Sequence, residues 1–248
     1  MQVALRAQLL KTAFATIGAV VDQGRLRCYA DRLEFGEIDS AHVCFVELRI
    51  EAAACARFRV ARDLELGLSV AALSKVLHFA QGHELVELSY TSKDSLGVRV
   101  ESGQRELDFE IRLLQISADQ ISFDQTYESW AVLPAAEFRG TCKALADLHL
   151  CDTVSLEVLG APAPALTFRL PDRLGRRTYA LGAGGALQEV HTAHACSASV
   201  ALSKLQLLHC DSDQSVTIAV DAQLPLRLSV GSAGCTLRLY VAPQEAAE

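Results

Sequence analysis

The sequence contains few lysines, few aromatic residues and no long apolar run. Five of its 248 residues are lysine, against eighteen arginines, and aromatic residues make up 6%. No apolar stretch approaches the roughly 20 residues that a membrane-spanning helix needs, and residues 1–4 show no basic region followed by an apolar segment. We therefore expect an intracellular protein without a membrane partner.

Cysteine is present, but not in a pattern that predicts disulfides or a metal site. The eight cysteines form no Cys-x-x-Cys pair and no regular framework, so we expect reduced thiols that pack as small apolar side chains. His191, His194 and Cys196 are closely spaced potential ligands, yet no fourth ligand or glutamate base lies at a recognised offset. A solvated loop before a helix is the better interpretation, and we predict no metal and no cofactor.

The sequence also lacks the common motifs of catalysis. It has neither a Gly-x-Ser-x-Gly nor a His-Glu-x-x-His motif, and the glycine-rich segment 182–185 is not followed by the Gly-Lys-Ser/Thr of a phosphate-binding loop. No pair of acidic residues stands out as catalytic. We therefore predict that the protein is not an enzyme and has no catalytic residue, and a metal-dependent hydrolase is the least favoured alternative.

Composition and charge indicate a folded protein with an acidic excess. Half of the residues are hydrophobic and 21% are charged, which is ordinary for a globular chain. The formal net charge of −7 argues at first against nucleic acid as a partner, because proteins that bind it usually carry basic residues that displace counterions from phosphates. A local gathering of positive charge would reconcile the two.

The order of predicted helices and strands occurs twice along the chain, as an internal repeat. The tetrapeptide Ala-Leu-Ser-Lys at 72–75 recurs at 201–204, and Lys11 and Lys143 lie at matching places in two other predicted helices. Alternating strands separate four segments with helical spacing of apolar residues, which are 9–21, 69–80, 134–148 and 199–209. The repeat predicts two similar domains.

We predict an α+β fold in which each domain has two helices packed on antiparallel β-sheets. The boundaries are residues 1–114 for the first domain, 115–129 for a connecting loop and 130–248 for the second domain. The loop is polar except for Ile121 and Phe123. Two apolar residues in a surface loop suggest a binding role.

The few lysines are not scattered at random. Each predicted helix carries one of Lys11, Lys75, Lys143 and Lys204, and His78 and His209 add weak positive charge nearby. Two interpretations remain open from spacing alone: the lysines lie on ordinary solvated helix faces, or they form a common basic surface.

Four short segments, in this order, resemble the proliferating cell nuclear antigen family of DNA sliding clamps. They are Ile-Asp-Ser-Ala-His-Val at 38–43, Leu-Ser-Lys-Val-Leu at 73–77, Glu-Phe at 137–138 and Leu-Tyr-Val-Ala-Pro at 239–243. The resemblance implies a homotrimeric head-to-tail ring that encircles duplex DNA independently of its sequence and acts as a polymerase processivity factor. It implies a nuclear protein if the source is a eukaryote, and a subunit of a heterotrimeric, checkpoint-type clamp is the alternative.

The resemblance implies that the helices line the central hole and contact DNA phosphates. The DNA-contacting residues are then Lys11, Lys75, His78, Arg139, Lys143, Lys204 and His209. The chain departs from the family because several positions where basic residues are expected hold uncharged ones, namely Thr12, Gly18, Gly140 and Leu208. We expect a weaker DNA contact, or one shared with Arg105, Arg112 and Arg139.

The resemblance also implies an outer pocket that captures short peptide motifs of DNA polymerase, the clamp loader, a flap endonuclease and DNA ligase in replication and repair. Its residues are Ile38, His42, Val43, Phe45, Ile121, Phe123, Pro225, Tyr240, Val241, Ala242 and Pro243. Core packing is the competing interpretation for several of them, above all Val43, Phe45 and Pro225.

The subunit edges are the third implied site. They comprise Phe79, Phe109, Ile111, Leu113, Cys142, Tyr179 and Leu181. No lysine lies between Lys143 and Lys204, so the second-domain lysine that many family members use for ubiquitin-type modification is absent.

Overall fold

The computed structural model describes two compact units. The described residues are 1–90, 94–102, 105–117, 123, 125–148, 152–171, 175–180, 186–232 and 234–244. The first unit is Met1–Ser122 with Ser232–Leu237, and the second is Phe123–Gly231 with Arg238–Glu248. Ile121 and Leu181, both predicted site residues, lie outside the described residues, as does the side chain of Arg105.

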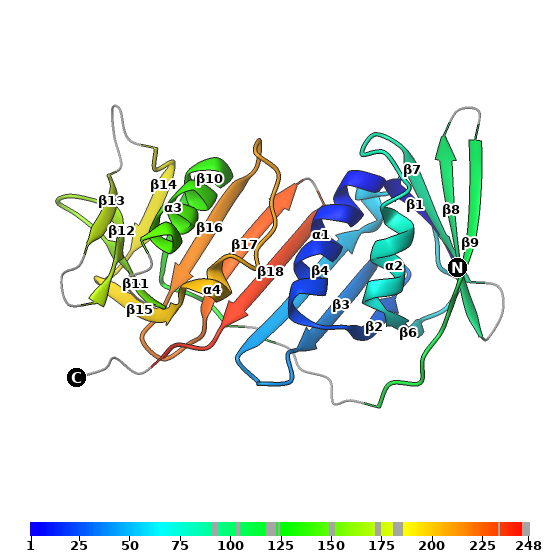
Figure 1. Cartoon of the computed structure of the whole chain (residues 1–248), viewed down its shortest axis with the longest axis horizontal. Coiled ribbons are helices and arrows are strands. Elements are labelled where there is room, and N and C mark those ends of the chain that lie inside the picture. Colours follow the sequence, from blue (N-terminus) through cyan, green and yellow to red (C-terminus); the bar gives the residue numbers. More distant parts are fainter. Residues whose placement is uncertain are drawn as a thin grey trace. The chain divides into compact units, whose positions relative to one another are not determined.

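In its described residues, the first unit has two α-helices and two runs of antiparallel strands (Figure 1). One sheet has the order β5-β1-β7-β8-β9, and the second run has the order β4-β3-β2-β6. The elements are β1 (Gln2–Arg6), α1 (Ala7–Val20), β2 (Gln23–Cys28), β3 (Arg32–Ile38), β4 (Cys44–Glu51), the 3-10 turn η1 (Ala52–Ala54), β5 (Arg57–Arg59), β6 (Leu64–Ser69), α2 (Val70–Leu77), β7 (Leu85–Ser89), β8 (Ser95–Ser102) and β9 (Arg105–Arg112).

Helix α1 forms because its apolar residues recur at helical spacing. Leu10, Ala13, Phe14 and Ile17 are buried along one stripe, which packs on the strands below. The ring of Phe14 meets the edge of Phe35 in β3 at a centroid distance of 6.1 Å. Helices α1 and α2 lie side by side on one face of β4-β3-β2-β6 (Figure 1).

The second unit repeats this plan. One sheet has the order β13-β12-β11-β15, and a second run has the order β14-β10-β16-β17. The elements are β10 (Ser129–Pro134), α3 (Ala135–Asp147), β11 (Thr153–Leu159), β12 (Ala165–Arg169), β13 (Arg176–Ala180), β14 (Glu189–Thr192), β15 (Cys196–Ala201), α4 (Leu202–Leu205), β16 (Ser215–Val220) and β17 (Leu226–Ser232), and β18 (Cys235–Val241) contributes residues to both units. The predicted α+β fold is confirmed.

The predicted fourth helix at 199–209 is too long. The structure ends β15 at Ala201 and keeps only Leu202–Leu205 as α4. Burial in β15 alternates, with Ala198 and Val200 inside, and the strand pairs antiparallel with β11. Pairing with a neighbouring strand therefore decides the structure of residues 199–201, although the local apolar spacing suits a helix.

Two local features of the first unit depend on particular residues, one at the start of α2 and one within β6. The hydroxyl of Ser69 accepts a hydrogen bond from the backbone N–H of Ala72 at 3.3 Å and caps α2. Leu114, at the start of the connecting segment, forms an antiparallel bridge with Gly67 of β6. A β-carbon at position 67 would overlap the Leu114 carbonyl, so this crossing requires glycine.

None of the helices in the described ranges combines the length and apolar character that crossing a bilayer requires. The cysteines that the structure describes are free thiols. Burial raises the pKa of Cys28, Cys142 and Cys235 to about 12, so these three stay protonated at neutral pH.

Candidate functional site

The helices of the first unit carry three of the predicted DNA-contacting side chains. Lys75 is exposed in the last turn of α2, and His78 is exposed at the end of that helix. Lys11 of α1 is half-buried, and its ammonium donates a hydrogen bond to the carbonyl of Ala80 at 2.9 Å. Lys11 therefore stabilises the packing of α1 near the end of α2 as well as adding charge, whereas Lys75 projects to solvent.

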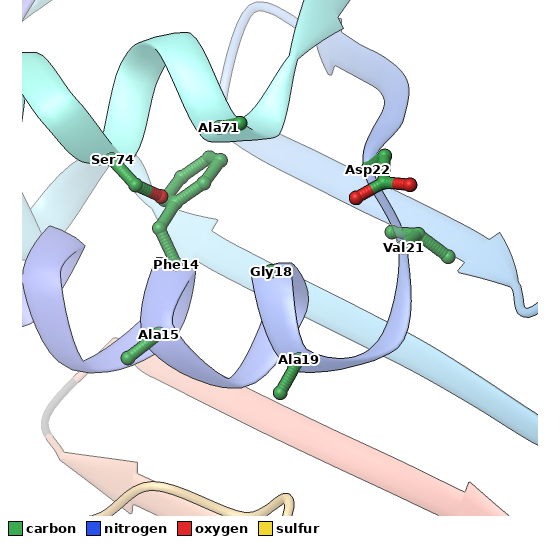
Figure 2. A pocket seen from close by; sticks show the side chains of 8 residues that line it. All are labelled: Phe14, Ala15, Gly18, Ala19, Val21, Asp22, Ala71 and Ser74. Atoms are coloured by element: carbon green, nitrogen blue, oxygen red, sulfur yellow. The ribbon is translucent and has the colours of Figure 1, made fainter.

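A shallow cavity of about 400 Å³ lies between the same two helices (Figure 2). Its wall contains the small residues Ala15, Gly18 and Ala19 from α1 and Ala71 and Ser74 from α2, as Figure 2 shows. Asp22 is the charged residue among those that line it. This part of the helix face offers no cation to a phosphate, which fits the departure from the family noted at Gly18.

The helices of the second unit and the residues next to them carry the other predicted DNA-contacting side chains. Arg139, Gly140 and Lys143 are exposed on α3, and a β-carbon at Gly140 would meet no atom within 4 Å. Lys204 is half-buried in α4, and His209 is exposed beyond it. Leu208 is buried, so its position belongs to the core and could not present a basic side chain.

Several of the predicted peptide-pocket residues lie in the second unit. Phe123 stacks on Tyr240 with ring centroids 5.1 Å apart, and the Tyr240 hydroxyl donates to the Phe123 carbonyl at 3.5 Å. Tyr127 donates to the Pro225 carbonyl at 2.6 Å, and burial raises its pKa to about 12. These contacts fix the start of the second unit against β18 and against the residue that precedes β17. Val241 is buried, Ala242 is half-buried and Pro243 is exposed.

The predicted pocket residues of the first unit lie around one turn. The Asp39 carboxylate accepts hydrogen bonds from the backbone N–H groups of Val43 at 2.7 Å and Cys44 at 2.9 Å. His42 has a positive φ of 54° and is exposed, whereas Ile38 and Val43 are half-buried. Phe45 is buried, which favours the core interpretation for that side chain.

The predicted subunit-edge residues differ in how much surface they offer. Phe79 is 64% exposed and stacks on Phe109 of β9 at 5.5 Å, while Leu113 is half-buried. Ile111 is buried, and Cys142 is 2% exposed within the second unit. The Cys142 side chain therefore has almost no surface for a second chain, and any effect on an edge would act through the packing of α3.

Tyr179 of β13 belongs to a hydrogen-bond cluster with α3. Its hydroxyl lies against that of Thr141 and 3.2 Å from the Glu137 carboxylate, which Arg177 also contacts at 3.3 Å. Burial is the main cause of the raised pKa of Tyr179. Sequence reasoning missed Glu137 and Arg177 as partners of Tyr179, although Arg177 and Tyr179 alternate on one strand and share a face.

The predicted absence of a metal site was argued from the sequence spacing of His191, His194 and Cys196. His191 lies in β14 beside Trp130, with ring centroids 5.6 Å apart. Among the residues that the structure describes, no three His, Cys, Asp or Glu side chains gather in a way that could hold a metal ion.

Two units of the same α+β plan, each with its helices on one face of antiparallel strands, define the fold of a DNA clamp. The solved structure of proliferating cellular nuclear antigen from Entamoeba histolytica shares it with a TM-score of 0.85 and 22% identity, covering 98% of each chain. Residues 3–122 match the family model described as "Proliferating cell nuclear antigen, N-terminal domain".

Curated relatives carry the same family name. Proliferating cell nuclear antigen 2 of Drosophila melanogaster is 27% identical over 72% of this chain and 70% of its own length. The Caenorhabditis elegans protein is 30% identical over 56% of this chain and 55% of its own length, and the Dictyostelium discoideum protein is 27% identical over 61% and 60%. The chain spans less than two thirds of these last two relatives. The N-terminal part of the chain, residues 3–122, is thus similar in sequence to this family, and the chain as a whole has its fold.

Proposed function

We propose that the protein is a non-enzymatic sliding clamp that forms a homotrimeric ring around duplex DNA. The observation that carries this proposal is that each unit has exposed basic side chains on a helix, namely Lys75 on α2 of the first unit and Arg139 and Lys143 on α3 of the second. Such contacts with phosphates hold the ring near DNA without reading a base, and topological closure retains it. A nuclear location follows from this role in a eukaryotic cell.

The DNA contact is tested by reversing the charge of Lys75 and Lys143, which are both exposed. We expect Lys75→Glu with Lys143→Glu to weaken binding to a short duplex by roughly tenfold or more at low salt, because each lost phosphate contact removes about 0.9 from the slope of log K against log salt. Fluorescence anisotropy over a salt series measures both quantities. The converse variant Gly140→Lys adds a cation one helical turn from Lys143, where space is free, and should tighten binding.

The control for the DNA experiment is a charge change of equal size elsewhere. Arg59 lies in β5, Arg62 follows that strand, and both are exposed. Arg59→Glu with Arg62→Glu should leave the affinity much closer to that of the unchanged chain. Equal loss in both double variants would show a response to net charge alone and contradict the assignment of the helix face.

We further propose that the surface around Phe123 and Tyr240 binds short peptide motifs of replication and repair proteins. Supporting this, the connecting segment places an aromatic ring on β18 beside the half-buried Ala242 and the exposed Pro243. An apolar surface with a backbone rim is a common peptide-binding arrangement. DNA polymerase, the clamp loader, a flap endonuclease and DNA ligase are the proposed partners, and the first-unit residues Ile38, His42 and Val43 remain predictions.

Truncation of Phe123 tests the peptide site. We expect Phe123→Ala to weaken binding of a synthetic peptide with a glutamine and aromatic anchors by about tenfold, since aromatic anchors dominate such contacts. Calorimetry measures the affinity, and light scattering verifies that assembly is unchanged. Tyr29→Ala, which removes another half-buried aromatic ring in the first unit, is the control. An unchanged affinity in Phe123→Ala would refute the site.

A further inference from the structure

Strand β9 carries a row of acidic side chains at the edge of its sheet. It is the last strand in the order β5-β1-β7-β8-β9. Glu106, Asp108 and Glu110 are exposed on one side of the strand, whereas Phe109 and Ile111 point to the side where Phe79 and α2 lie. Arg112 is exposed at the end of the strand, beyond the acidic row.

Strand β13 carries the opposite charge at another sheet edge. It is the first strand in the order β13-β12-β11-β15, and its Arg176 and Arg177 are exposed. Arg177 shares the helix side of the strand with Tyr179, as shown by the contacts of both residues with Glu137 of α3. Strand residues alternate sides, so Arg176 points to the opposite side.

Part of this charge is already neutralised within each unit. Asp108 pairs with Arg99 at 2.7 Å, and Arg177 pairs with Glu137 at 3.3 Å. In the part of the chain that the structure describes, Glu106, Glu110 and Arg176 take part in no ion pair. Each edge thus keeps charge that a complementary surface can use.

We propose that the ring of this protein closes through ion pairs, in which Glu106 and Glu110 of one copy face Arg176 of the next. The inference rests on the proposed clamp function, and its occupant is a second copy of the same chain. When two edge strands pair antiparallel, side chains on one side of the first strand lie beside those on the same side of the second. The acidic row then meets Arg176, and the Phe79–Phe109 stack meets Tyr179 and Arg177 on the helix side.

The same charges select the polarity of assembly. Pairing of two β9 edges would bring acidic rows together, and pairing of two β13 edges would bring arginines together; like charges placed opposite each other oppose both arrangements. Each copy has one edge of each kind, so association runs head to tail. A head-to-tail contact that closes yields a ring and leaves neither strand edge open.

The contact between the β9 edge of one copy and the β13 edge of the next is called the seam below. Ion pairs at this seam would make the stability of the ring depend on salt. Added salt screens such pairs, because the Debye length falls from about 10 Å at 0.1 M salt to about 3 Å at 1 M. We therefore expect the dissociation constant of the trimer to rise roughly tenfold or more over this range, as measured by analytical ultracentrifugation at several protein concentrations. A seam held by backbone bonds and apolar contacts alone would show little change.

Charge reversal and its repair give the decisive test. Arg176→Glu and Glu110→Arg should each raise the dissociation constant at 0.1 M salt by roughly tenfold or more, and the chain that carries both changes should recover most of the loss. Arg59→Glu on β5 and Glu189→Arg on β14, which are exposed residues at other sheet edges, are the matched controls and should assemble like the unchanged chain. Circular dichroism verifies that every variant is folded.

The possible outcomes distinguish failure of the ion-pair proposal from failure of the proposed clamp function. If the unchanged chain forms a trimer that neither salt nor Arg176→Glu weakens, the ion-pair proposal is wrong and the clamp function stands. If the doubly changed chain stays as weak as the single variants, the facing of Glu110 and Arg176 is wrong. If the unchanged chain is monomeric at every salt concentration and micromolar protein, both the seam and the homotrimeric clamp are overturned.

Discussion

Replacement of Gly67 by alanine is expected to lower the free energy of unfolding by about 3 kcal/mol. The new methyl group would overlap the carbonyl of Leu114, which is backbone and cannot rotate away. Relief requires the connecting segment to move, and that movement breaks the hydrogen bond from the Leu114 N–H to the Gly67 carbonyl, now 2.9 Å long. Urea denaturation followed by circular dichroism measures the loss.

Gly140→Ala is the matched control for this prediction. Gly140 lies within α3 with open space around its α-carbon, so an added methyl group should stabilise the chain by about 0.5–1 kcal/mol through helix propensity. Opposite signs for the same substitution at the two positions would demonstrate that close backbone approach decides the result at Gly67. Equal, small effects would contradict the crossing of the connecting segment at β6.

Removal of the Glu37 side chain is expected to lower the free energy of unfolding by a comparable amount, about 3 kcal/mol. Arg25 is 6% exposed, and its Nε lies 3.2 Å from the Glu37 carboxylate, whose side chain is 12% exposed. The same carboxylate accepts the backbone N–H of Arg25 at 3.1 Å. Glu37→Ala would leave a buried guanidinium without its closest counter-charge, which is far more costly than losing a surface pair.

Glu65→Ala is the comparison that isolates burial. Glu65 contacts Arg25 at 3.5 Å and Arg27 at 3.3 Å, but its side chain is 50% exposed. Water replaces much of that interaction, so the expected loss is at most about 1 kcal/mol. Denaturation curves of the two variants should differ clearly, and similar losses would mean that Arg25 is less buried in solution than the structure places it.

The helices were predictable where their apolar spacing agrees with burial in three dimensions. Leu10, Phe14 and Ile17 predict α1, and Phe138, Cys142 and Leu145 mark α3 in the same way. The segment 199–209 shows why spacing alone is insufficient, because its first residues pair with β11, far away in the sequence. The pairing partner lies outside any short segment of sequence, so local apolar spacing cannot predict this pairing.

The sequence predicted the kind of candidate site, but not which side chains contact one another within it. One lysine on each predicted helix indicated a basic helix surface, but the bond from Lys11 to the end of α2 depends on residues 69 positions apart. Likewise, Phe123 and Tyr240 meet across 117 positions. The alternation of acidic and apolar residues in β9 is visible in the sequence, whereas its place at a sheet edge is not, because the strand order decides that.

The division of β18 between the two units has a consequence for biosynthesis. The first unit includes residues 232–237, and the backbone N–H of Glu51 donates to the carbonyl of Gly234 at 2.7 Å. Although residues 1–122 leave the ribosome first, the strand segment that completes this unit emerges only after residues 123–231 of the second unit. Emerging domains generally fold as units during synthesis, but here the first unit must wait for a segment that follows most of the second unit before its sheet is finished.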